Sequence, residues 1–309
     1  MPHIPETSSS SASAPANAQS ILDQLADIKA EAEKNKVQLT PEVKQYIREH
    51  LEAVQQKLAN REDVTEDDLE FIKTVRSWVM KEKLIKQFNL DVQHTERLST
   101  LKHYGFLNEN GESREGDVQP PAFEKAMSAF KPEELEIASY FQKPVLLLIP
   151  ETSFAAKVRT LDAHKQGMQE NNTYVDDIFT KTDSGSDKIT GWRAVIVDGA
   201  QEMEPYEGDN LDLKFAKRIK NRKSARKPGE KGMDRHRYAL LMMEAIRNGD
   251  PIDKELYTLL DDDPALSASD VPNADCPLSR KVLFNTVDPD GADDCARFRS
   301  SVGGDVLIT

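Results

Sequence analysis

Cysteine is scarce in this sequence, and its cysteines stand in no metal-binding pattern. Only Cys276 and Cys295 occur among the 309 residues. They lie close enough in sequence to pair, but a chain of this length without a secretory signal has little need of a disulfide framework, so we expect reduced thiols. Neither cysteine belongs to a CxxC motif, and the chain contains no HExxH motif. We therefore expect no zinc site, no other metal and no cofactor.

Long apolar runs are also missing. The longest aliphatic run, Val145–Ile149 between two prolines, is far shorter than the roughly 20 apolar residues of a membrane-spanning helix. The first residues, MPHIPETSSSSASAPANA, lack the basic start and apolar stretch that characterise a secretory signal. These absences predict a cytoplasmic protein that has no contact with membranes.

Positive charge is in short supply over the chain as a whole. Lysine and arginine number 41 against 54 aspartates and glutamates, which leaves a formal net charge of -13. This balance excludes a protein that grips nucleic acid with its entire surface, so any site for a polyanion must be local. With 38% hydrophobic and 31% charged residues, the chain is polar but still apolar enough to bury a core.

The N-terminal third is patterned for helices behind a polar tail. Residues 1–18 are rich in Ser, Ala and Pro, a composition that predicts a disordered tail. Residues 19–107 then show apolar positions three and four apart in three stretches, for example at Val43, Ile47 and Leu51, and they predict a helical hairpin or a three-helix unit. An intermolecular coiled coil is the alternative, although each stripe covers only about two to three heptads.

A polar loop separates this unit from a region of mixed pattern. Residues 108–121 contain Asn, Glu and Gly and end in a Pro-Pro pair, so they predict a linker. Within residues 122–309, the runs Val145–Ile149 and Trp192–Val197 are short, lie between proline or turn residues, and predict buried strands among helices. The expected fold is therefore helix-rich α+β, with an N-terminal helical unit followed by a mixed α/β module with a small sheet.

Four segments of the second region resemble a known family. They read PVLLLIPETSFAAKV, TDSGSDKITGWRAVIVDG, GMDRHRYALLMMEAIRNG and ARFRSSVGGDV, and they begin at Pro144, Thr182, Gly232 and Ala296. These segments resemble a family of uncharacterised bacterial proteins over roughly residues 130–309. The resemblance implies a bacterial, non-secreted protein with a recurring C-terminal module. It implies no catalytic residue, because the family has no assigned activity.

The strongest departure from the average composition is a basic segment, Lys214–Arg237. It holds eleven lysines and arginines against Glu230 and Asp234, a net charge of +9, so the rest of the chain carries -22. Such segregation favours a local site that displaces counter-ions from phosphates. The alternative is a solvated helix that docks on the acidic surface of the protein itself. The candidate nucleic-acid or anion-binding residues are Lys217, Lys220, Arg222, Lys223, Arg226, Lys227, Lys231 and Arg235.

Acidic runs match no catalytic or metal-binding motif. The stretch from Asp288 to Asp294 has the look of a calcium loop but lacks the spacing of an EF-hand, so we expect a solvated turn. Three consecutive aspartates, Asp261–Asp263, also stand in no recognisable pattern.

The basic segment favours a cytoplasmic binding protein that contacts nucleic acid or another polyanion. Two alternatives stay open at this point. One is an enzyme acting on a phosphorylated or nucleotide substrate, with Lys231 and Arg235 at the anion and Asp198 as the base, which requires these groups to converge on one pocket. The other is an adaptor without a ligand, which makes protein contacts through the N-terminal helices.

Overall fold

The computed structural model describes most of the chain, which divides into two compact units, Met1–Glu82 and Lys83–Thr309. Residues 1–17 of the predicted tail and Cys276 lie outside the described set. The described residues are 18–37, 39–60, 62, 65–114, 119–150, 152–163, 174–175, 179, 191–249, 252–253, 255–263, 266–267, 270–275, 282–306 and 308.

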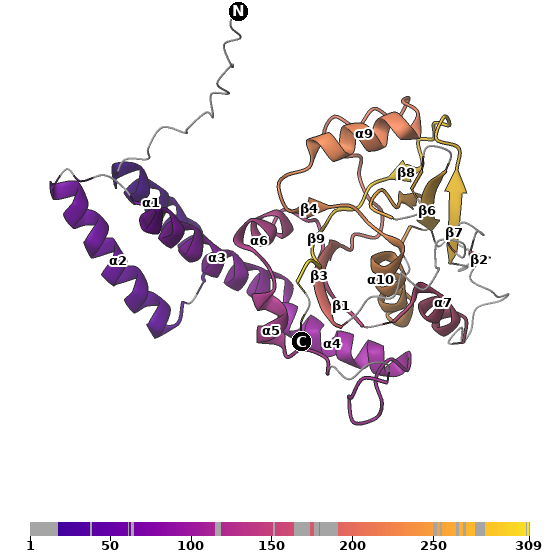
Figure 1. The fold of residues 1–309 in the computed structure, drawn as a ribbon, viewed down its shortest axis with the longest axis horizontal. Helices are drawn as coiled ribbons and strands as arrows, with labels where there is room; N and C mark the ends of the chain where they lie inside the picture. Colours follow the sequence, from indigo (N-terminus) through magenta and orange to yellow (C-terminus); the bar gives the residue numbers. More distant parts are fainter. Residues whose placement is uncertain are drawn as a thin grey trace, which may run out of the picture. The chain divides into compact units, whose positions relative to one another are not determined.

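Helices form the first unit, in the part of it that the structure describes. They are α1 (Ala18–Lys34), α2 (Pro41–Asn60) and the larger part of α3 (Glu66–Phe88) (Figure 1). Helix α2 begins at a proline, which suits the first helical position, and the Thr40 hydroxyl accepts a hydrogen bond from the Val43 N–H at 3.4 Å. At the start of α3, the Asp68 carboxylate accepts a hydrogen bond from the Thr65 N–H at 2.8 Å. Both starts are those that the capping residues predict.

The helices of the first unit share one apolar core. Tyr46, Ile47 and Trp78 pack against it while remaining partly exposed. The core therefore unites the apolar stripes that the sequence shows in its N-terminal third. Its buried members come from all three helices and are Ile21, Ile28, Val54, Phe71, Ile72, Val75 and Val79.

The division between the units lies inside α3, between Glu82 and Lys83. From the sequence, a linker is expected at residues 108–121, of which residues 115–118 lie outside the described set, and this expectation stays a prediction. The next helix along the chain packs with the second unit.

That next helix, α4 (Leu90–His103), is bound to strand β1 (Pro144–Ile149). The Gln93 side-chain oxygen accepts a hydrogen bond from the Leu146 N–H at 2.9 Å. The Arg97 Nε donates to the Leu146 carbonyl at 2.8 Å. A helix that supplies partners to a strand's backbone belongs to the same folding unit as that strand.

The second unit combines helices with two small sheets, which confirms the helix-rich α+β fold. One sheet has the strand order β1-β3-β9-β4 and the other has the order β2-β7-β6-β5-β8, where the sequence analysis expected a single small sheet. None of the helices in the described ranges has both the length and the apolar character needed to cross a bilayer. The further elements are α5 (Phe123–Ser128), α6 (Pro132–Ala138), α7 (Phe154–Ala163), β2 (Tyr174–Val175), β3 (Arg193–Asp198), α9 (Phe215–Ala225), β4 (Glu230–Lys231), α10 (Arg235–Arg247), β5 (Tyr257–Leu259), β6 (Val271–Asp275), β7 (Leu283–Val287), β8 (Ala296–Arg297) and β9 (Ser301–Gly303).

The two strands that the sequence predicts form the centre of the first sheet. Strands β1 and β3 pair antiparallel, with Leu147 opposite Val195. Every residue of β1 is buried, as expected for a continuous apolar run covered on both faces. Helices α4 and α10 both pack against β1 (Figure 1).

Arg299 joins the two sheets of the second unit. It lies between β8 of one sheet and β9 of the other, and its side chain is fully buried. The guanidinium donates to the carbonyls of Asp198 (3.0 Å) and Ala200 (2.7 Å) at the end of β3. It also binds the buried carboxylate of Asp253 and the hydroxyl of Thr258 in β5 (3.0 Å). Burial alone would lower the pKa of Arg299, but the charge of Asp253 and its hydrogen bond, together with smaller contributions from neighbouring groups, outweigh burial and raise the pKa.

We expect Asp253→Asn to lower the free energy of unfolding by about 3–5 kcal/mol, because it leaves the Arg299 guanidinium buried without a counter-ion. Asp290→Asn is the control, since Asp290 pairs with Lys214 at 2.9 Å where both side chains are more than half exposed. Exposed pairs contribute about 1 kcal/mol or less. Urea unfolding of both variants measures the difference, and equal losses would contradict a structural role for Arg299.

Candidate functional site

Helix α9 (Figure 1) forms the centre of the basic segment, and its two faces differ in exposure. Phe215, Arg218, Ile219 and Arg222 are buried on one face. Phe215 and Ile219 join an apolar cluster with residues of β5, β6 and β8. The opposite face is exposed and carries only polar and small residues, which is the division that a 3.6-residue period imposes on a surface helix.

Arg218 is a structural residue rather than a ligand-binding one. It makes a bidentate ion pair with Asp209, with Nη2–Oδ2 and Nε–Oδ1 distances of 2.8 and 3.0 Å, and neither side chain is more than 1% exposed. Its remaining donors bind the carbonyls of Asp293 and Ala296. These contacts engage all three nitrogens of the guanidinium inside the fold.

Arg222 is also engaged within the protein. It pairs with Glu230, and the Ser300 hydroxyl donates to the same Glu230 oxygen at 2.7 Å. Burial alone would raise the pKa of Glu230, but the hydrogen bond from Ser300 and the charge of Arg222 outweigh it, so the pKa is lowered. Glu230 is therefore a stable anion that holds Arg222 within the fold.

Arg226 and Arg235 bind the three consecutive aspartates to which the sequence analysis assigned no role. Arg226 pairs with Asp261 and, at 2.7 Å, with Asp262. Arg235 pairs with Asp263 at 2.7 Å, and both side chains are fully buried. The aspartate run thus provides the internal counter-charge of the basic segment, although Asp262 lies 36 residues from Arg226 in the sequence.

Gly232 lies where this network leaves no room for a side chain. Its N–H donates to Asp262 at 2.7 Å. A Cβ atom at this position would collide with the side chains of Asp261 and Arg226. The close approach of the backbone to the carboxylates therefore requires glycine here.

Lys231 also finds its partners inside the chain. Its Nζ donates to the Gly303 carbonyl at 2.9 Å and pairs with Asp305. The hydrogen bond from Lys231 is the largest influence on Asp305 and lowers the pKa of that carboxyl. Of the eight predicted binding residues, Arg222, Arg226, Lys231 and Arg235 are thus engaged with the protein's own acidic and backbone groups.

The other four predicted residues are lysines, and all are exposed. Lys217, Lys220 and Lys223 follow one another at three-residue spacing on the outer face of α9, and Lys227 lies just beyond its end. Within the described ranges, no carboxylate pairs with Lys217, Lys220 or Lys223. We call these four residues the lysine face.

Beside the lysine face, the Nζ of Lys227 lies 4.3 Å from the centroid of the Tyr140 ring. Tyr140 is 66% exposed, so the ring is available to solvent. Both residues line a cleft of about 420 Å³. Tyr140 lies outside the basic segment Lys214–Arg237, so the composition of that segment gives no sign of an exposed aromatic ring beside the lysines.

The cleft does not have the composition that the enzyme alternative requires. It includes Asp198, but Lys231 and Arg235 are not among its lining residues. The carboxylate of Asp198 accepts hydrogen bonds from the N–H groups of Gln142 (2.9 Å), Lys143 (3.2 Å) and Ala200 (3.2 Å). Asp198 thus shapes the end of β3, and the predicted base does not meet the predicted anion-binding pair.

No family model matches this chain, and searches of curated proteins and of solved structures find no match either. The chemistry of its own residues is therefore the basis for assigning a function.

Asp261 makes the stability of the folded state depend on pH. Burial raises the pKa of Asp261 to about 6, although the charge of Arg226 opposes the rise. A carboxyl whose pKa is raised by folding favours the folded state at low pH, and this contribution is lost as the pH rises through about 6.

Asp261→Asn removes this titration. As the pH rises from 5 to 7, the free energy of unfolding of the variant minus that of the parent should therefore increase by about 1 kcal/mol. Urea unfolding at both values measures the gain. Asp262→Asn is the control, because the pKa of Asp262 is lowered and its titration lies below this window. Parallel pH profiles for Asp261→Asn and the parent would contradict the assignment.

Proposed function

We propose that this chain is a cytoplasmic binding protein that contacts nucleic acid through its lysine face. The observation that carries the proposal is the array of exposed lysines on α9, three of which have no carboxylate partner within the described ranges. The arginines of the same segment hold the fold together, so the lysines alone remain for a partner. They form one surface rather than a scattered set of charges.

The chemistry of this surface favours contacts with phosphate groups. Lysine presents a mobile point charge with no fixed hydrogen-bonding geometry, so it neutralises phosphates without reading bases. Each neutralised phosphate releases condensed counter-ions, and this release supplies the affinity of non-specific binding. Binding through the lysine face should therefore be independent of sequence.

The exposed ring of Tyr140 adds a preference for single strands. Lys227 lies against Tyr140, so a phosphate held by Lys227 brings its base near an aromatic surface. Stacking of bases on aromatic rings is tolerant of sequence but needs bases that are not paired. The lysine face and Tyr140 together suit a short single-stranded segment.

The rest of the chain opposes the interaction. The net charge is -13, and the cleft beside Tyr140 also carries Glu204 and Glu207. An acidic body repels the phosphate backbone at long range, an effect that salt screens less strongly at low ionic strength. We therefore expect weak binding that depends on the lysine face alone.

The first test is a fluorescence anisotropy titration of labelled single-stranded and duplex oligonucleotides at low salt. If the four lysines neutralise four phosphates, the log-log dependence of duplex affinity on salt should have a slope of about -3 to -4. The triple variant Lys217→Glu, Lys220→Glu, Lys223→Glu should abolish binding. The control is the triple variant Lys34→Glu, Lys131→Glu, Lys143→Glu, which changes the net charge by the same amount at other exposed lysines. This control should retain most of the binding. No binding at tens of micromolar protein, or equal losses in the two variants, would overturn the proposal.

The second test concerns the aromatic ring. Tyr140→Ala should weaken binding of the single-stranded oligonucleotide by about 1–3 kcal/mol, the usual effect of losing one stacked base, and leave duplex binding nearly unchanged. Tyr140→Phe keeps the ring and should bind like the parent protein. A Tyr140→Ala variant that binds both oligonucleotides as the parent does would remove Tyr140 from the site.

A further inference from the structure

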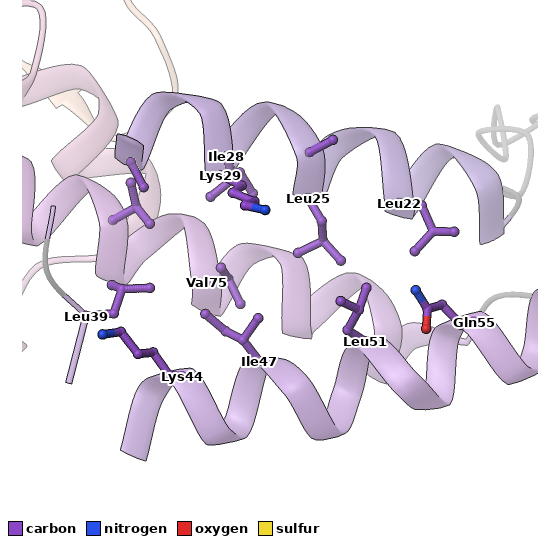
Figure 2. Close-up of a pocket in the computed structure, with 13 residues that line it drawn as sticks. Leu22, Leu25, Ile28, Lys29, Leu39, Lys44, Ile47, Leu51, Gln55 and Val75 are labelled. Atoms are coloured by element: carbon purple, nitrogen blue, oxygen red, sulfur yellow. The ribbon is translucent and has the colours of Figure 1, made fainter. Parts of the chain in front are cut away.

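The first unit contains an apolar groove of about 460 Å³. Figure 2 shows Leu22 and Leu25 of α1 pointing toward the groove from one side, and Ile47 and Leu51 of α2 from the other. Val75 of α3 lies between them and forms part of the floor. All of its lining residues belong to the first unit, so the groove is complete within that unit.

The walls of the groove are apolar but only half-buried. Leu22, Leu25, Ile47 and Leu51 are each intermediate in exposure, whereas Val75 on the floor is buried. Aliphatic side chains at four facing positions would gain about 25 cal/mol for each Å² of apolar surface that a partner removes from water. Facing aliphatic side chains of this kind form a concave apolar surface that a partner's side chains can fill.

The dimensions of the groove suit a helix. Its lining runs from Leu22 to Ala32 along α1 and from Lys44 to Gln55 along α2. At 1.5 Å per residue, each wall is about 15 Å long, or nearly three helical turns. A helix lying along the groove would contact α1 and α2, and its side chains would reach Val75 and Val79 of α3.

The charged residues that line the groove indicate which kind of helix it would bind. Its charged lining residues are Lys29 on the α1 side and Lys44 on the α2 side, and no carboxylate lines it. Both lysines are exposed. Lys29 lies 3.9 Å from Glu33, but with side chains 78% and 70% exposed, this pair is too weakly held to neutralise the site.

We infer that this groove binds an amphipathic helix of a partner protein, one that carries acidic residues beside its apolar stripe. The stripe supplies leucine-like side chains that fill the space between α1 and α2, and the carboxylates pair with Lys29 and Lys44. This interaction is independent of the lysine face, because it uses a different unit and a different kind of partner.

The test uses the full chain and two labelled synthetic peptides of about 18 residues, long enough to form a helix on binding. Both peptides carry leucines at helical three- and four-residue spacing. One has glutamates flanking the stripe, and the other has lysines at the same positions. In anisotropy titrations, we expect saturable binding of the glutamate peptide and at least about tenfold weaker binding of the lysine peptide.

Two variants assign the binding to the groove. Ala26→Trp places a large side chain among the lining residues without deleting an apolar contact, so it should weaken binding of the glutamate peptide by about tenfold or more and leave the helical content unchanged. Lys29→Glu with Lys44→Glu, both at exposed positions, should reverse the preference between the peptides. Lys34→Glu with Lys73→Glu changes exposed lysines of the same unit outside the groove and should bind as the parent does.

The inference fails if neither peptide binds saturably or if the Ala26→Trp variant binds as tightly as the parent. It also fails if sedimentation shows a dimer in the absence of peptide that Ala26→Trp dissociates, because the groove would then belong to a second copy of the chain. Nucleic-acid binding by the Ala26→Trp variant, which keeps the net charge, should equal that of the parent, so failure of this inference is distinguishable from failure of the lysine face.

Discussion

The second unit depends on guanidinium groups that are held by carboxylates inside the fold. A buried guanidinium costs several kcal/mol in lost hydration unless its donors are all paired, and Arg299 satisfies this condition through Asp253 and the backbone at the end of β3. Because Arg299 also donates to Thr258 of β5, its contacts reach both sheets and fix how one sheet meets the other. Arg218 with Asp209 plays the same part between α9 and the loop that precedes it. The sheets are short, so these pairs supply constraints that the few ladder hydrogen bonds do not.

Most basic residues of the segment have separated into two populations by side-chain type, and Lys231, which binds Gly303 and Asp305, is an exception. The guanidinium is planar, weakly hydrated and matched to carboxylate geometry, whereas the ammonium of lysine is compact and strongly hydrated. Accordingly, Arg218, Arg222 and Arg235 are buried in ion pairs, and Lys217, Lys220 and Lys223 remain in solvent. The two interpretations of the basic segment, docking on the protein itself and binding a polyanion, therefore apply to different residues. The first describes the arginines, and the second is proposed for the lysines.

The parts of the fold that local patterns encode were predictable, and those that depend on distant partners were not. Apolar periodicity and capping residues predict α1 to α3, and proline and turn residues delimit β1 and β3. The strands of the second sheet escape detection because they are two to five residues long and include residues such as Pro272 and Asn273, which are uncommon in strands. The candidate site divides in the same way. Spacing along α9 shows which lysines share a face, but no local pattern pairs Arg235 with Asp263, 28 residues away.

The residues at positions 226, 232 and 261 constrain one another, because Gly232 lies against the side chains of Arg226 and Asp261. It leaves space for Asp261 and Arg226 only because it has no Cβ, so any other residue at this position requires both neighbours to shrink or move. Loss of Arg226 alone would in turn leave buried Asp261 without its counter-charge. The positions are thus expected to change as a set or not at all. In a collection of sequences that share this fold, glycine, aspartate and arginine here should co-vary, although they are spread over 36 positions of the chain.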